Sequence, residues 1–92
     1  MVEDFEQDDF DMLDPSAKRV LIALSKFEKG VLVKVDLLHR STGLMPDGLN
    51  DVVRHLSQSK LINILETPRV VPYDFYAIEM TDFGREVLAK YG

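Results

Sequence analysis

Apolar residues recur along this chain with two different periods, and each period predicts a type of secondary structure. Over residues 17–27 they recur every three or four positions, which is the spacing of one buried helix face. Asp14 can cap this first helix, and Pro15 suits its first position because the missing N–H costs nothing there. Lys29 and Gly30 suit its end, since a cation is favourable in the last turn and glycine can adopt the left-handed conformation.

Two shorter helices joined by a glycine-containing turn are predicted next. Val31–Val33 is too short and too β-branched for a helix, and it predicts a brief strand. A helix is then expected from Val35 to Ser41, broken by Thr42 and Gly43. A third helix begins at Pro46 and runs to about Ser59. Its buried face is formed by residues at helical spacing, Leu49, Val52, Val53 and Leu56.

Beyond the third helix the pattern changes to β-rich runs. Leu61–Thr67 and Phe75–Met80 predict a hairpin, and the prolines in the 68–74 segment between them predict an irregular seven-residue tip. Thr81 can cap a closing helix that runs to about Lys90. This order of elements predicts an α+β fold, a winged helix-turn-helix with a three-helix core, a two-stranded wing and a C-terminal helix.

The charge of the chain is unevenly distributed and divides it into two parts. The net charge is −5 over 92 residues. Residues 1–14 carry seven acids and no bases, giving −7, whereas the rest carries 11 basic residues against nine acids, giving +2. We therefore distinguish an acidic N-terminal tail, residues 1–13, from a folded domain, residues 14–92. Two structures are open for the tail: a solvated terminus, or a short amphipathic turn that docks Phe10 and Leu13 on the body or on a second subunit.

Several classes of function lack support in the composition. The chain has no cysteine, so it forms no disulfide or thiolate zinc site, and its two histidines, His39 and His55, lack metal-ligand spacing. No apolar run is long enough to cross a membrane, and the first residues do not resemble a signal peptide, so a cytoplasmic protein is expected. The serines have no partner base and no glycine-rich phosphate loop is present, so we expect neither enzymatic activity nor a metal or cofactor.

Two motifs resemble winged-helix transcriptional regulators of archaea and bacteria, the group of MarR-, ArsR- and PadR-like proteins. Leu44–Leu56 is similar to the recognition-helix pattern of that group, and Leu61-Ile62 to the apolar pair that enters the wing. Met80–Glu86 is close to the L-T-x-x-G-R-E motif that starts the final helix. The resemblance implies a homodimeric DNA-binding protein, and it implies that Gly84 permits a close approach to a neighbouring element.

The chain departs from the resembling proteins at three positions. Lys60 stands where glycine is frequent, Asp51 stands where a basic or hydroxylated residue is frequent, and Arg69 is the single cation in the predicted wing tip. A carboxylate on the groove-facing side repels phosphate. These departures bear on DNA binding more than on the fold.

The predicted recognition helix supplies the candidate base-reading residues. Arginine pairs with guanine and asparagine or glutamine with adenine, and the outward face or flank of the helix offers Asn50, Asp51, Arg54, His55 and Gln58. The candidate phosphate contacts are the nearby cations Lys34, Arg40, Lys60 and Arg69. Two alternatives remain open: this face is simply the solvated side of an amphipathic helix, or the domain is a protein-interaction module within a larger assembly.

Overall fold

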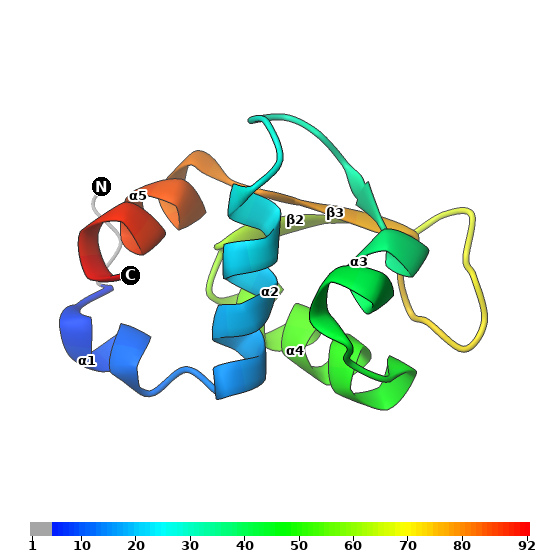
Figure 1. The fold of residues 1–92 in the computed structure, drawn as a ribbon, viewed down its shortest axis with the longest axis horizontal. Coiled ribbons are helices and arrows are strands. Elements are labelled where there is room, and N and C mark those ends of the chain that lie inside the picture. The colour runs from blue at the N-terminus through cyan, green and yellow to red at the C-terminus, as the bar shows by residue number, and fades with distance from the viewer. Residues whose placement is uncertain (1–4) are drawn as a thin grey trace.

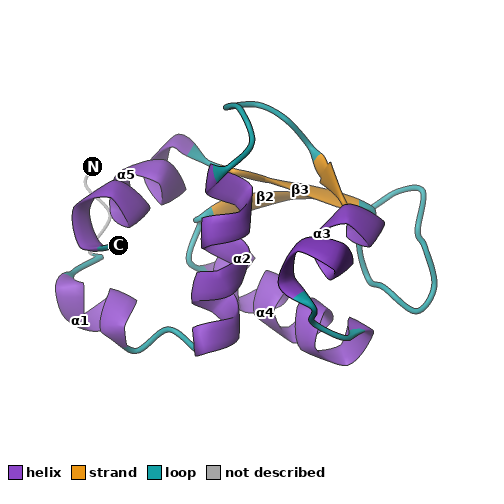
Figure 2. Cartoon of the chain, in the orientation of Figure 1, coloured by secondary structure: helices purple, strands orange, loops and turns teal. Residues whose placement is uncertain are grey.

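Helix α2 (Pro15–Ser25) runs through the middle of the molecule, and three other helices and the sheet pack around it (Figure 1). The computed structural model describes residues 5–92, and these form five helices and a three-stranded antiparallel sheet, an α+β arrangement (Figure 2). None of the described helices is long and apolar enough to cross a membrane.

The start of α2 is as predicted, but its predicted end is wrong. The Asp14 carboxylate accepts a hydrogen bond from the Ser16 N–H at 2.8 Å, and Pro15 is the first helical residue. The helix ends at Ser25, and Lys26 is its C-cap. Gly30 does adopt a left-handed φ of 86°, but in a separate turn after the helix. The apolar spacing continues past the true end because Phe27, in the next turn, still packs against the core.

Helices α3 (Val35–Thr42) and α4 (Pro46–Gln58) lie where the sequence predicts them, within a residue or so. Gly43 ends α3 in the left-handed conformation, with φ 74°. The Thr42 hydroxyl is buried there and donates to the Leu38 carbonyl at 2.7 Å. The inner face of α4 consists of the four predicted apolar residues, all of them buried: Leu49, Val52, Val53 and Leu56.

The sheet has the strand order β1-β3-β2, so the last strand in sequence lies in the centre. Strand β1 (Val33–Lys34) begins two residues later than predicted, and Val31 and Leu32 are exposed instead of paired. Strands β2 (Ile62–Leu65) and β3 (Ala77–Met80) are shorter than predicted. The connection between them therefore spans residues 66–76, which we call the β2–β3 loop.

Helix α5 (Asp82–Tyr91) closes the fold and begins at the predicted cap. The Thr81 hydroxyl accepts a hydrogen bond from the Gly84 N–H at 2.9 Å. The same hydroxyl donates to the Leu61 carbonyl at 3.0 Å, which ties the start of α5 to the residue before β2. Residue 84 consequently lies directly against the Leu61 backbone.

Part of the acidic segment is folded, as the docked alternative for the tail proposes. Residues Gln7–Asp11 form α1, which packs against α5 (Figure 1). Phe10 is only 7% exposed and belongs to the hydrophobic core, and Leu13 packs against that core. Phe5 makes ring contacts with Phe83 and Tyr91 of α5. Residues 1–4 of the predicted tail lie outside the described residues.

Candidate nucleic-acid interface

Helix α4 separates its apolar and polar residues onto opposite sides. Its apolar side is buried, and on the other side Asp51, Arg54, His55 and Gln58 are all exposed. Four of the five predicted base-reading residues are thus brought together on one accessible surface. Because Arg54 and Gln58 are one helical turn apart, their side chains follow each other along the helix axis.

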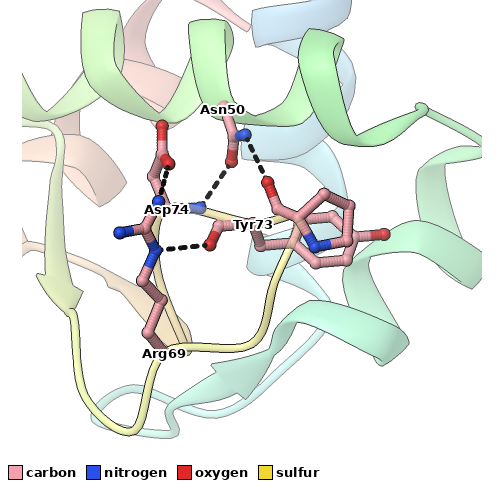
Figure 3. Close-up of polar contacts among 5 residues, drawn as sticks. Asn50, Arg69, Tyr73 and Asp74 are labelled. Atoms are coloured by element: carbon pink, nitrogen blue, oxygen red, sulfur yellow. Dashed lines mark hydrogen bonds and ion pairs between the residues drawn. The ribbon is translucent and has the colours of Figure 1, made fainter.

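Asn50, the fifth candidate, lies differently from the other four. Its side chain is half-buried and faces the β2–β3 loop (Figure 3). Its Nδ2 donates to the Pro72 carbonyl at 3.1 Å, and its Oδ1 accepts from the Asp74 N–H at 2.9 Å. Both polar atoms of the amide are therefore bonded to the backbone of the loop, whereas pairing with adenine requires both of them.

Arg54 is held by its neighbour on the same helix. Its Nη1 lies 3.0 Å from a carboxylate oxygen of Asp51, and the two side chains are 57% and 62% exposed. An ion pair this exposed contributes only about 0–1 kcal/mol, because solvent screens it and two side chains are ordered to make it. The guanidinium can therefore leave Asp51 for a stronger, bidentate partner at small cost.

The four predicted phosphate contacts lie at different places in the fold. Arg40 on α3 pairs with Asp36 at 3.4 Å, and Arg69 in the β2–β3 loop pairs with Asp74 at 3.1 Å. Lys34, which precedes α3, lies over a tyrosine ring, 5.7 Å from the centroid. Arg40 and Arg69 would therefore have to leave a carboxylate, and Lys34 a ring, before they could bind phosphate groups.

Lys60, the fourth cation, follows α4 in the left-handed conformation, with φ 64°. It lines a groove of about 330 Å³ together with Asp9 and Phe83, so α1 reaches the C-terminal end of α4. A second groove, of about 290 Å³, lies between α4 and the β2–β3 loop and contains Arg54 and Asp74 among its lining residues. The two grooves border α4 at different places.

The histidines occupy different environments, and neither belongs to a metal cluster. The Nδ1 of His39 lies 2.8 Å from the Leu44 carbonyl, so this ring supports the turn between α3 and α4. His55 is exposed on α4. Within residues 5–92, no group of three or more histidine, aspartate or glutamate side chains is placed to hold a metal ion.

The structure adds residues to the site that sequence reasoning missed. Pro72 and Asp74 present the backbone atoms that bind Asn50, although they are 22 and 24 residues away in sequence. Asp74 also neutralises Arg69 (Figure 3). No local pattern signals these contacts, because they depend on the path of an irregular loop across α4.

Comparison with known proteins identified no relative of this chain. None of the models of protein families matched, and neither did any of the curated proteins or solved structures that were searched.

Proposed function

We propose that this chain is a non-enzymatic winged helix-turn-helix domain that binds double-stranded DNA and regulates transcription in the cytoplasm. In this proposal α4 is the recognition helix in the major groove, and the β2–β3 loop is the wing. The observation that carries it is the exposed row of Arg54, His55 and Gln58 on α4, the helix that follows the α3 turn. The element order and the β1-β3-β2 sheet agree with such a domain.

Base contacts supply much of the selectivity in this proposal, and phosphate contacts are few. The candidate phosphate contacts number four, Lys34, Arg40, Lys60 and Arg69. Since each phosphate contact adds about −0.9 to the slope of log K against log salt, one domain should give a slope no steeper than about −3.6. We expect a homodimer to compensate for this small number by placing two α4 helices about 34 Å apart along one face of a duplex.

Retention on an immobilised random-sequence duplex tests the proposal. The wild-type protein should be retained at about 50 mM salt and released as salt rises, because phosphate contacts weaken with added counterions. The variant Arg54→Glu provides the matched control, because it reverses one exposed charge on α4 and should elute earlier. Flow-through of the wild-type protein at low salt would contradict DNA binding.

One observation favours a second function, that of a protein-interaction module. Asp36, Asp51 and Asp74 each neutralise a cation that a DNA-binding surface would need. A protein partner with its own mixed charges would tolerate this balance better than a row of phosphates. Absence of retention on the duplex, with the fold intact by circular dichroism, would favour this function over DNA binding.

A further inference from the structure

The β2–β3 loop is folded on itself, and its tip is apolar. The Tyr73 N–H donates to the Val70 carbonyl at 2.7 Å, and Arg69 donates to the Tyr73 carbonyl and pairs with Asp74. Arg69 is the single basic residue of the loop, so its charge is compensated within the loop. Val71 is left 80% exposed beyond these bonds.

One side chain outside the loop fixes its position against α4. The two hydrogen bonds of Asn50 reach backbone atoms on either side of Tyr73 (Figure 3). The Tyr73 ring in turn packs edge-on against the Phe75 ring, with centroids 6.0 Å apart, and Phe75 is buried in the core. The amide therefore joins the surface of α4 to the part of the loop that is anchored in the core.

We propose that Asn50 is a positioning residue that holds the β2–β3 loop so that Val71 contacts the same duplex that α4 reads. The inference rests on the proposed function. Asn50 differs from its neighbours on α4 because it is half-buried and its amide is engaged by backbone atoms. Proteins insert apolar side chains between base steps in the minor groove, and an apolar tip on a fixed loop suits such a contact better than a neutralised Arg69 does.

The first experiment measures the positioning in the free protein, without DNA. Hydrogen exchange at the Asp74 amide is compared in the wild type, in Asn50→Ala and in Gln58→Ala. Gln58 is the matched control, because it is an amide side chain on the same helix and no hydrogen bond joins it to the loop among the described residues. Exchange at Asp74 should accelerate in Asn50→Ala and stay unchanged in Gln58→Ala. Equal exchange in all three proteins would overturn the inference.

The second experiment is a double-mutant cycle on a duplex that the wild type has enriched from a randomised pool. Val71→Ser should weaken binding about fivefold in the wild-type background, the size of a coupling of about 1 kcal/mol between contacting residues. In the Asn50→Ala background the same substitution should have little effect, because the loop is no longer held at the duplex.

A different result identifies Asn50 as a base reader instead. Asn50→Ala would then lose preference at one base pair, and its effect would multiply with that of Val71→Ser. If the two substitutions act independently in this way and the wild type still binds DNA, Asn50 does not position the loop, but the proposed function stands. Failure of the wild type to enrich any duplex, together with no retention on random DNA, overturns both.

Discussion

Gly84 lies so close to the backbone carbonyl of Leu61 that a β-carbon at position 84 would overlap the carbonyl oxygen. The same β-carbon would lie 2.7 Å from Cγ of Met80. The Leu61 carbonyl cannot easily retreat, because it also accepts hydrogen bonds from the Thr81 N–H and hydroxyl. The glycine that the sequence motif contains is therefore required for packing between α5 and the start of β2.

The variant Gly84→Ala should lower the free energy of unfolding by up to about 2 kcal/mol. Overpacking costs about 1–3 kcal/mol, and the better helix propensity of alanine offsets about 1 kcal/mol of this. Gly84→Leu should lower the free energy of unfolding further, because its side chain is larger. Urea denaturation measures the change, with Gly48→Ala as the control, because a β-carbon at Gly48 in α4 meets no atom within 4 Å. That control should be neutral or stabilising, and equal effects at the two glycines would contradict the close contact.

Lys60 provides a second backbone test, because its φ of 64° is one that glycine adopts without strain. Lys60→Gly and Lys60→Ala both remove the charged part of the side chain. The difference in stability between them therefore reports how well each residue tolerates the left-handed conformation. The glycine variant should be more stable than the alanine variant by about 1 kcal/mol, the reverse of the order in a helix. For a domain of this size that difference corresponds to about 4–8 °C in melting temperature. A more stable alanine variant would mean that residue 60 is not left-handed.

The sequence predicts some parts of this fold well because their causes are local. Asp14 and Thr81 bond to groups two or three residues away, and both caps were predicted. Periodicity misplaces the end of α2, because Phe27 continues the apolar spacing in a turn that is no longer helical. The site depends on longer-range contacts. The exposed position of Arg54 follows from helical periodicity, whereas the half-buried position of Asn50 depends on the loop.

Arg54→Ala should weaken specific DNA binding by about 1–3 kcal/mol and relax preference at one base pair, if the guanidinium pairs with a base. Stability should change little, because the Arg54 side chain is exposed and its ion pair with Asp51 contributes little. Fluorescence anisotropy with the enriched duplex and single-base variants measures both effects. Arg54→Lys is the control, since it keeps the charge but loses the bidentate fork. Wild-type affinity and preference in Arg54→Ala would exclude Arg54 as a reader.

The last prediction concerns the acidic residues of α1, one of which, Asp9, lines a groove at the C-terminal end of α4. Asp9 and Lys60, a cation that phosphate would use, line the same groove. Our hypothesis is that α1 restrains non-specific DNA binding by competing for such cations. Truncation of the segment would also remove Phe10 from the core, so substitutions that change only charge give the cleaner test.

The double variant Asp9→Asn, Asp11→Asn should bind a random-sequence duplex more tightly than the wild type at low salt. The asparagine oxygen at position 9 can still accept the Glu6 N–H, which the Asp9 carboxylate binds at 2.9 Å, so α1 should stay folded. Glu28→Gln, Glu86→Gln is the matched control, because it removes the same charge from residues that do not line the Lys60 groove. The gain in affinity for the random-sequence duplex should disappear as salt screens the carboxylates.

At about 50 mM salt the screening length is somewhat above 10 Å, so competition should be measurable there. Equal non-specific affinity of the two double variants under these conditions would show that the effect is one of net charge and that α1 does not compete for the DNA surface.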